Sequence, residues 1–279
     1  MKLLVLLLTL GTSLIFAGAR SDHLRVPATS KIPKKIWQTY KTKQLPYPAR
    51  EAQSTWLKKN PNYEYIFFDD EDIEKYIRNQ WDDRTLTFFK ALPVGAMKAD
   101  LWRYLIVTTE GGIYSDIDSV CCRQITSWPT KVPKYANDVL ILGMEKWGCF
   151  CQWTIASTKQ HPAMQYVCEY VINYYFNHGI DLNRERFVIF TTGPGIWSDA
   201  LSSYMGVSNL SAPQIYDRYR RNRAFKNHIN KLGIWIEPVS YYDGNCSQNL
   251  SGSSTFGDGY ISWVTEQNRL KEEANKQIK

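Results

Sequence analysis

Histidine is scarce in this chain: four of the 279 residues are histidine, and none follows His228. The six cysteines never form a Cys-x-x-Cys pair. Structural zinc sites are built mainly from such cysteine pairs and from histidine. The sequence therefore argues against a zinc site and favours oxygen ligands for any bound metal.

Internal repeats, long linkers and low-complexity segments are absent as well. The chain is 44% hydrophobic and 14% aromatic, which is enough to bury a sizeable core. Its length suits one large α/β domain. We expect a single folded domain over residues 31–279.

Apolar runs of membrane-spanning length are lacking beyond the N-terminus. There, Lys2 precedes an apolar run that ends in Ala17-Gly18-Ala19, a small-residue pattern typical of signal-peptidase sites. Because this run of about 17 residues is near the lower limit for crossing a bilayer, residues 1–19 are either a cleaved signal peptide or a short type II signal-anchor. Residues 20–30 are interpreted as a polar stem. The rest of the chain is expected on one side of the membrane, the lumenal side of the secretory pathway.

Two further features agree with a lumenal location. Asn-x-Ser sequons begin at Asn209, Asn245 and Asn249. The cysteines are even in number, so we expect some of them to be bridged, although the sequence selects no pairing. They are Cys121, Cys122, Cys149, Cys151, Cys168 and Cys246.

The stretch from Gly95 to Val120 carries the main motif of the chain. Up to Thr109, large apolar residues recur at intervals of three and four, which predicts a helix with one buried stripe. Asp100 and Arg103 share another face of that helix. Gly111-Gly112 ends it, because glycine tolerates the backbone conformations of a helix C-terminus and a tight connection.

A strand is predicted directly after the glycines, over Ile113–Asp118. Alternation in that strand sends Tyr114, Asp116 and Asp118 to one face. The two carboxylates, about 7 Å apart, repel each other unless a cation or a proton lies between them. An isolated Asp-x-Asp is more often a solvated turn, but the preceding helix and glycines favour a site for Mg²⁺ or Mn²⁺ with positions open to phosphate oxygens.

At these residues the chain resembles the glycosyltransferases of family 32, a group with the GT-A fold, and within it the initiating α-1,6-mannosyltransferases of fungal N-glycan outer chains. The matching segments occur in the order of the family: KIPKKIWQTYK from Lys31, NPNYEYIFFDD from Asn60, KADLWRYLIVTTEGGIYSDIDSV from Lys98, TGPGIWSDAL from Thr192, and Ser262-Trp263. The resemblance implies a Rossmann-like, mainly parallel α/β sheet flanked by helices. It also implies retaining sugar transfer from a GDP-sugar with Mn²⁺ or Mg²⁺ as cofactor.

The resemblance assigns roles to individual residues. Asp116 and Asp118 are implied as the metal motif, and Asp100 and Arg103 as catalytic residues that hold the donor sugar. Further donor contacts are implied for Trp37, Tyr114, Gly193, Gly195, Ser262 and Trp263. The tryptophan Trp37 is a candidate for stacking on the base, or else a core residue. The two glycines either shape the sugar pocket or simply precede a helix.

One position departs from the family. Fungal members typically carry a histidine a few residues before the terminal Ser-Trp, and this chain does not. With Trp263 as the anchor, Asp258 falls near that position. Asp258 is either a third metal ligand, since a carboxylate suits Mg²⁺ and Mn²⁺, or a turn residue between two glycines.

The remaining segments fit the same fold. Two strands, over 31–40 and 63–68, flank a helix over 51–59, which predicts a βαβ unit with parallel strands. Residues 73–89 are predicted to be helical, and 139–143 to form a buried strand.

Three further segments each have a structural and a functional interpretation. The acidic run 69–72 is interpreted as a helix N-terminus and not as a metal site. The His161-Pro162 pair is predicted to start a helix, and the histidine receives no catalytic role. The loop over 145–151, with Trp147, either lines the acceptor side or only packs.

The chain has a formal net charge of +7. Its densest basic cluster is Arg218, Arg220, Arg221, Arg223 and Lys226. It is interpreted as a solvated basic loop, since a nucleic-acid partner is not expected behind a secretory signal.

The resemblance and the motif together lead to one expected function. The chain is expected to be a metal-dependent glycosyltransferase that moves mannose from GDP-mannose to a glycan, most simply an N-linked glycan, in the Golgi lumen. The membrane would be a partner only if residues 1–19 are not cleaved from the chain. The alternatives are inositol phosphoceramide as the acceptor and a glycan-binding relative without turnover.

Overall fold

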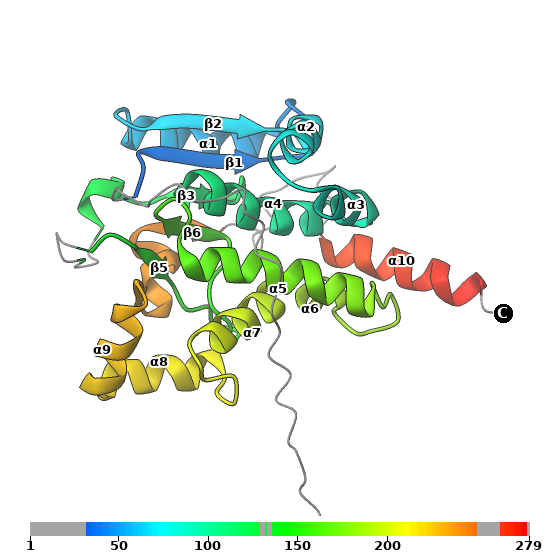
Figure 1. Cartoon of the computed structure of the whole chain (residues 1–279). Helices are drawn as coiled ribbons and strands as arrows, with labels where there is room; N and C mark the ends of the chain where they lie inside the picture. The colour runs from blue at the N-terminus through cyan, green and yellow to red at the C-terminus, as the bar shows by residue number, and fades with distance from the viewer. Residues whose placement is uncertain (1–31, 129–131, 133–135, 250–262, 278–279) are drawn as a thin grey trace, which may run out of the picture.

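The computed structural model describes residues 32–128, 132, 136–249 and 263–277. Its centre is a six-stranded sheet with the order β2-β1-β3-β6-β5-β7 (Figure 1). β1 is parallel to β2 and β3, and β5 is parallel to β7, whereas β6 runs antiparallel to β3 and β5. The predicted mainly parallel α/β sheet is confirmed. The strands are β1 Lys35–Thr39, β2 Glu64–Phe68, β3 Gly112–Ser115, β5 Leu140–Leu142, β6 Thr154–Ser157 and β7 Ile234–Ile236.

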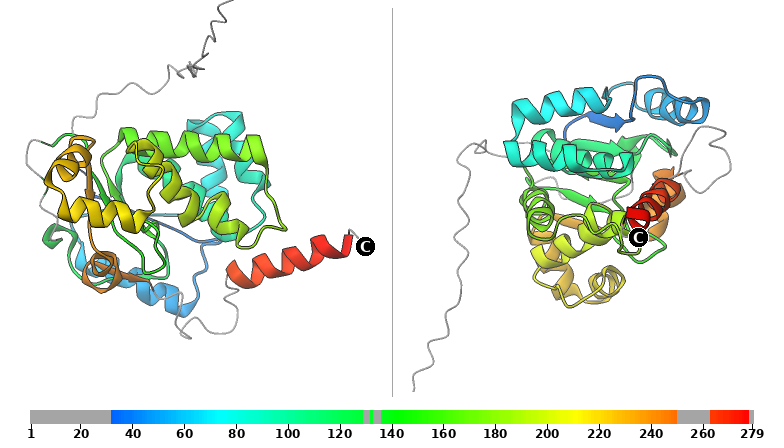
Figure 2. Two further views of the ribbon diagram at one scale, coloured as in Figure 1. Left: turned by 90° about the horizontal axis from the view of Figure 1, so that it is seen from below. Right: turned by 90° about the vertical axis from the view of Figure 1, so that its right-hand side faces the viewer.

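Helices cover both faces of this sheet (Figure 2). α1 (Tyr47–Lys59) lies on one face, and α4 (Gly95–Glu110) and α5 (Pro162–His178) lie on the other. A second, small sheet pairs β4 (Ser119–Cys121) with β8 (Ser247–Asn249). The other helices are α2 Asp70–Gln80, α3 Asp83–Ala91, α6 Phe187–Thr191, α7 Pro194–Tyr204, α8 Ala212–Arg221, α9 Arg223–Lys231 and α10 Trp263–Gln277.

Alternation along the strands divides the interior into two cores. One core contains Trp56 of α1 together with Ile36, Ile113, Ile141 and Ala156. The larger core, on the side of α4 and α5, contains the sequence neighbours of those strand residues, namely Trp37, Tyr114, Leu140 and Ile155. Period-two alternation therefore sends Tyr114 to the side of the sheet that carries α4.

The connection from α4 to β3 requires both of its glycines. Gly111 and Gly112 have φ values of 66° and 99°. An added Cβ would lie 2.5 Å from the Lys159 backbone nitrogen at the first glycine and 2.7 Å from the Lys35 carbonyl oxygen at the second. The predicted Gly-Gly break is confirmed, for reasons of both backbone conformation and close packing.

The strand after these glycines is shorter than predicted. β3 ends at Ser115, which pairs with Thr154 of β6, and the next residues form a turn. The Ser119 N–H donates to the Asp116 carbonyl oxygen at 3.0 Å and leads the chain into β4. The prediction of a strand through Asp118 was wrong, because the ladder with β6 ends one residue before the first acid. A turn, and not strand alternation, relates Asp116 to Asp118.

Several helices differ from their predicted extent. α1 begins at Tyr47, earlier than expected, with Pro48 in its first turn. The helix predicted over 73–89 is divided into α2 and α3, because Asp82 caps the second helix by accepting from the Thr85 N–H at 2.8 Å. The interpretation of the acidic run as a helix N-terminus is confirmed by a capping box between Asp69 and Asp72 at the start of α2.

The basic cluster lies on helices and not in a loop. It spans the end of α8 and the start of α9. Arg220 and Arg221 there pair with Asp217 at 3.3 Å and 2.7 Å. These are surface ion pairs, which agrees with a solvated face.

All six cysteines lie in the described residues and carry free thiols. The expectation of disulfides is therefore not met in this structure. Cys168 on α5 lies against Thr108, with 3.2 Å between Sγ and Oγ1, and the Cys121 thiol donates to the Arg123 carbonyl oxygen at 3.1 Å. Of the sequons, Asn209 is exposed.

The segments over residues 1–19 and 20–30 lie outside the described residues, as do Asp258 and Ser262. Within the part of the chain that the structure describes, no helix combines the length and apolar character needed to cross a bilayer.

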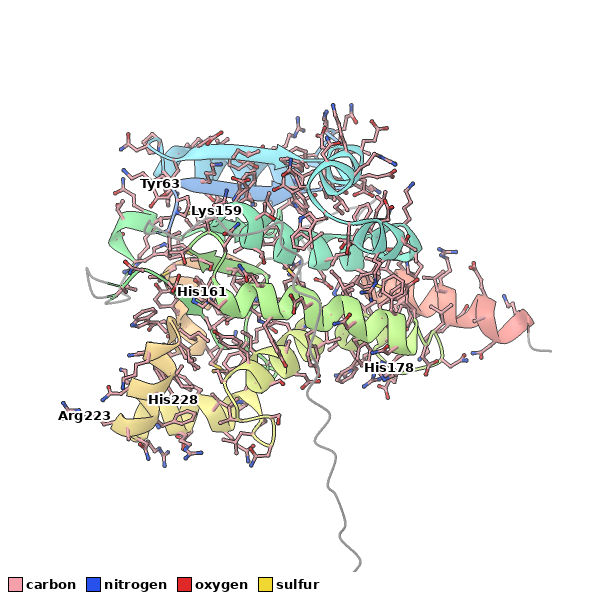
Figure 3. All side chains as sticks on the ribbon, viewed as in Figure 1. Tyr63, Lys159, His161, His178, Arg223 and His228 are labelled. Atoms are coloured by element: carbon pink, nitrogen blue, oxygen red, sulfur yellow. The ribbon has the colours of Figure 1, made fainter. Side chains whose placement is uncertain are left out.

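His161 caps α5 and is buried in the interior (Figure 3). The Ala163 N–H donates to its Nδ1 at 3.1 Å, and its Nε2 lies 3.1 Å from the Gly233 carbonyl oxygen. This pattern requires a neutral ring with the proton on Nε2. Burial lowers the pKa of His161 to about 4. The histidine thus has a structural role at the helix start.

We expect His161 to make stability depend on pH. Between pH 6.5 and 4 the unfolded chain takes up a proton that the folded chain does not, so stability is lost as the pH falls. From pH 7 to pH 5 the free energy of unfolding should fall by ~2 kcal/mol more in the wild type than in His161→Asn, which can cap the helix but cannot titrate. Urea unfolding at both pH values measures this, and an equal fall in the two proteins would contradict it.

Candidate active site

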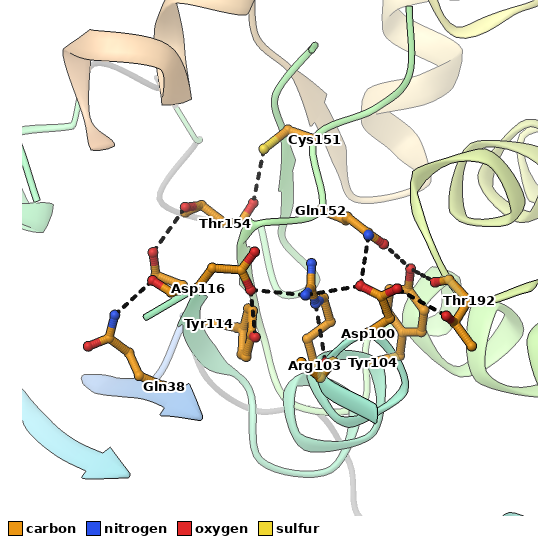
Figure 4. Close-up of polar contacts among 12 residues, drawn as sticks. Gln38, Asp100, Arg103, Tyr104, Tyr114, Asp116, Cys151, Gln152, Thr154 and Thr192 are labelled. Atoms are coloured by element: carbon orange, nitrogen blue, oxygen red, sulfur yellow. Dashed lines mark hydrogen bonds and ion pairs between the residues drawn. The ribbon is translucent and has the colours of Figure 1, made fainter. Parts of the chain in front are cut away.

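Two residues of α4 reach the turn that follows β3 (Figure 4). Arg103 Nη2 lies 3.0 Å from Asp100 Oδ1 and 2.9 Å from Asp116 Oδ1. The Arg103 and Asp100 side chains are 4% and 5% exposed, and that of Asp116 is 23% exposed. One buried guanidinium thus joins the helix acid to the first acid of the Asp-x-Asp motif. The prediction that Asp100 and Arg103 share a helix face is confirmed.

Asp100 is also held by neutral donors from two distant segments. Gln152 Nε2 donates to Oδ1 at 2.9 Å, and Thr192 Oγ1 donates to Oδ2 at 3.0 Å. The Tyr104 hydroxyl contacts both donors, through Gln152 Oε1 and the Thr192 carbonyl oxygen. Burial raises the pKa of Asp100 to about 6, although the Arg103 charge opposes the shift. Asp100 is therefore a buried anchor for Arg103 with little surface for a ligand.

Asp116 has one engaged oxygen and one open oxygen. Its Oδ1 accepts from Arg103 and from the Tyr114 hydroxyl, the latter at 2.7 Å, and the guanidinium lies 4.9 Å from the Tyr114 ring centroid. Gln38 Nε2 fixes the backbone by donating to the Asp116 carbonyl oxygen at 3.0 Å. No described residue hydrogen-bonds to Oδ2. Burial raises the pKa of this carboxyl group, and the Arg103 charge opposes the shift. Among the described residues, side-chain contacts to Asp116 thus engage Oδ1.

The acids of the turn fit a hard divalent cation. Asp118 lies in the same turn as Asp116 and is buried. Asp100 and Glu145 add negative charge nearby, against the single Arg103 guanidinium. Across residues 32–128, 132, 136–249 and 263–277, no group of three or more His, Cys, Asp or Glu side chains converges on a metal position. Asp116 and Asp118 are therefore the two acids that the turn itself could contribute to a hard cation, and their oxygens are of the kind that such a cation prefers.

Glu145 approaches the cluster from the connection between β5 and β6. The charges of Arg103, Asp116 and Asp100 act on its carboxyl group, as does the nearby backbone of Gln152. Burial raises the pKa of Glu145 to about 7. The side chain of Gln152 is bonded to Asp100, so Glu145 and Gln152 both belong to the surroundings of the Arg103 cluster.

The sequence assigned no individual role to Gln152, Thr192 or Glu145, although Glu145 begins the loop over 145–151 that was a candidate for the acceptor side. Thr192 opens the TGPGIWSDAL segment, so a signal for it was present. Nothing in the sequence marks Gln152, whose role depends on a contact with a residue far away in the chain.

Two other predicted donor contacts, Trp37 and Trp263, pack against the larger core. Trp37 is 4% exposed, donates through Nε1 to the Gly111 carbonyl oxygen at 2.8 Å, and packs edge-on against Phe68. In this structure it is a core tryptophan and has no free ring face for a base. Trp263 begins α10 and packs, partly buried, on the larger core.

The two glycines of the TGPG segment are explained by packing. An added Cβ would lie 2.7 Å from Ile189 Cα at Gly193 and 2.9 Å from the Ile189 carbonyl oxygen at Gly195. They allow α7 to begin directly against α6, which matches the alternative of a turn that precedes a helix.

Comparison with known proteins concerns this same region. Residues 46–134, which include Asp116 and Asp118, match the glycosyltransferase sugar-binding region containing the DXD motif. The matched region makes up about a third of the chain. The family 32 resemblance is thus confirmed. Asp116-Ile117-Asp118 is the D-x-D sequence that we predict as its DXD motif, and we refer to this turn as the DXD turn.

Two curated relatives come from Schizosaccharomyces pombe. The initiation-specific alpha-1,6-mannosyltransferase is 31% identical over 226 residues, covering 69% of this chain and 56% of that protein. Inositol phosphoceramide mannosyltransferase 2 is 25% identical over 213 residues, covering 72% and 52%. The chain spans about half the length of these curated relatives.

The solved structure of PaToxG glycosyltransferase has a similar fold. It aligns with a TM-score of 0.52 and 20% identity, over 78% of this chain and 89% of that chain. At this identity the similarity concerns the fold alone, and it confirms the expected GT-A architecture of this DXD-family chain.

We expect Thr192→Val to weaken the structure around the DXD turn. The change keeps the shape of the side chain but leaves Asp100 Oδ2 without its donor, at a cost of about 1–3 kcal/mol in the free energy of unfolding. Thr87→Val, on the exposed face of α3, is the matched control and should change stability by less than about 0.5 kcal/mol. Chemical denaturation measures both variants, and equal effects would show that Asp100 does not depend on Thr192.

Proposed function

We propose that this chain is a retaining, metal-dependent α-1,6-mannosyltransferase that moves mannose from GDP-mannose to an N-linked glycan in the Golgi lumen. The observation that carries the proposal is the buried Arg103 guanidinium between Asp100 and the DXD acid Asp116. The relative named as an alpha-1,6-mannosyltransferase supports the sugar and the linkage. The apolar N-terminal segment and the sequons support the compartment.

In this proposal the buried network presents the open oxygen of Asp116 to the donor. Asp100 holds Arg103, and Arg103 together with Tyr114 fixes Asp116 Oδ1. The other oxygen, Oδ2, would then be left for the metal ion and its donor. Asp100 and Arg103 then act on the donor by positioning Asp116. Ser262 and Trp263 remain proposed donor contacts.

Asp116 and Asp118, with Asp258 as a proposed third ligand, would hold Mn²⁺ or Mg²⁺. The ion supplies positive charge that stabilises the GDP diphosphate as the glycosidic bond breaks. The leaving group is already a stabilised phosphate and needs no proton, so no residue is assigned as general acid.

Inositol phosphoceramide is the second candidate acceptor, favoured by the similarity to inositol phosphoceramide mannosyltransferase 2. It would leave the donor site unchanged. Labelled GDP-mannose, offered with a high-mannose oligosaccharide or with inositol phosphoceramide vesicles, separates the two. Label in the oligosaccharide supports the proposal, and label only in the lipid overturns its acceptor.

A lack of Mn²⁺-dependent GDP release from any sugar nucleotide would instead support a glycan-binding protein without turnover.

We expect Asp116→Asn and Asp118→Asn to lower Mn²⁺-dependent GDP release from GDP-mannose at least ~100-fold, because an amide cannot hold a hard cation against water as a carboxylate does. Asp258→Ala should raise the Mn²⁺ concentration needed for half-maximal activity. Asp217→Asn on α8 is the surface control and should be unchanged. Wild-type turnover in Asp116→Asn, with circular dichroism showing a folded protein, would refute the metal assignment.

We expect Arg103→Lys to lose most activity, by about 100-fold in kcat/KM. A lysine ammonium cannot contact two carboxylates with a planar set of donors while lying over the Tyr114 ring. The activity is compared per folded molecule, with the folded fraction taken from the melting curve. Near-normal activity per folded molecule would reduce Arg103 to a structural ion pair. Arg78→Lys, an exposed pair on α2, is the control.

A further inference from the structure

A short hairpin connects β5 to β6 beside the DXD turn. Met144 bridges to Phe150, and the Glu145 N–H donates to the Cys149 carbonyl oxygen at 2.8 Å. The Phe150 N–H donates to Ser198 Oγ of α7 at 2.9 Å, which fastens the hairpin to the helical layer. Its backbone is thus held in place at both its base and its flank.

The tip of this hairpin displays an unpacked tryptophan. Trp147 is 90% exposed, whereas the next most exposed large hydrophobic side chain among the described residues, Tyr47, is 66% exposed. A tryptophan usually buries most of its surface, so one held in water on a fixed hairpin leaves its ring available to a ligand. The flat indole face suits the C–H face of a sugar ring, and its N–H can bond to a hydroxyl.

The base of the same hairpin faces the donor side. Gln152, two residues beyond the hairpin, donates to Asp100 at 2.9 Å, and the charges of Arg103, Asp116 and Asp100 act on Glu145 at the hairpin base. Only Lys146 separates Glu145 from Trp147, so their Cα atoms are at most about 7 Å apart. That span is comparable to one or two sugar rings, so a single oligosaccharide can contact both residues.

We propose that Trp147 and Glu145 form the acceptor subsite. The indole stacks on an acceptor sugar, and the Glu145 carboxylate accepts a hydrogen bond from the hydroxyl that lies next to the donor. This inference rests on the proposed transferase function and names the acceptor class within it, a neutral carbohydrate.

The charges around the hairpin favour a neutral acceptor over a phosphate-bearing one. Lys146 is the only basic residue between Met144 and Phe150, and its Nζ is paired with Asp243 Oδ2 at 2.6 Å. The other charged groups near the hairpin base are acidic, namely Glu145 and the two acids of the DXD turn. A lipid phosphate would meet repulsion there, whereas hydroxyl groups find hydrogen-bond acceptors.

The test uses the full chain with GDP-mannose, Mn²⁺ and a high-mannose oligosaccharide as the probe. Trp147→Ala should raise the oligosaccharide KM about tenfold, which corresponds to ~1.4 kcal/mol of lost stacking. Trp147→Phe should restore KM to within about threefold. GDP release without acceptor should stay within about twofold of the wild type in both variants, because neither touches the donor network.

Phe176→Ala is the matched control, since Phe176 is a 41% exposed aromatic residue near the end of α5. It should leave the oligosaccharide KM unchanged. Glu145→Gln keeps the shape of the side chain and should lower kcat/KM for the oligosaccharide about tenfold or more.

An unchanged oligosaccharide KM in Trp147→Ala would overturn the subsite. So would a loss of acceptor-free GDP release equal to the loss of transfer, since that indicates a general structural effect. If the wild type neither releases GDP nor transfers mannose, the proposed function fails by itself. Calorimetric titration of the oligosaccharide then tests the subsite separately: weaker binding to Trp147→Ala supports it, and an equal Kd overturns it.

Discussion

The Arg103 guanidinium lies between the Asp100 and Asp116 carboxylates, 3.0 Å and 2.9 Å away, with almost no exposure to water. Removing charges from water costs several kcal/mol per ion unless pairing and hydrogen bonds compensate. The neighbouring residues supply those bonds: Gln152 and Thr192 donate to one acid, and Tyr114 donates to the other. Four separate segments of the chain are therefore fixed relative to one another by the need to satisfy one buried charge cluster.

Matched element lengths bring these groups together. From Asp100 to Gly111 the helix rises by about 16 Å, at ~1.5 Å per residue. From Gly111 to Asp116 the chain returns by about 16 Å, at ~3.3 Å per residue. Because Gly111 and Gly112 reverse the chain tightly, the first acid after the strand reaches the level of the acid near the start of the helix. A change in either length would separate Arg103 from Asp116.

Much of this arrangement could be predicted from local pattern. The spacing of the apolar residues in α4 predicted that Asp100 and Arg103 share a face of the helix. Gly111 and Gly112 predicted the reversal of the chain after it. The end of β3 could not be found in the same way, because the alternation of Ile113–Asp118 continues past the last residue that β6 pairs. Local periodicity carries no information on where a partner strand stops.

Tertiary context decided the remaining assignments. Trp37, Gly193 and Gly195 belong to segments that match the family, yet their surroundings are close packing around Gly111 and Ile189. Gln152 and Glu145 stand in a stretch without any motif, and their importance depends on contacts made across the fold. A family motif thus located the site, while the side chains that support it became visible only in three dimensions.

β6 is the one strand of the large sheet that runs against its neighbours, and Ser115 at the end of β3 pairs with Thr154 at its start. The segment that leads into β6 therefore arrives at the same sheet edge from which the DXD turn departs. Under the proposed roles, the donor and acceptor contacts come from two stretches of sequence that meet at this register, the DXD turn after β3 and the hairpin over 144–150 before β6. A substitution at the tip of the hairpin lies outside the residues that pair β3 with β6, so it would change the acceptor contacts without changing that register.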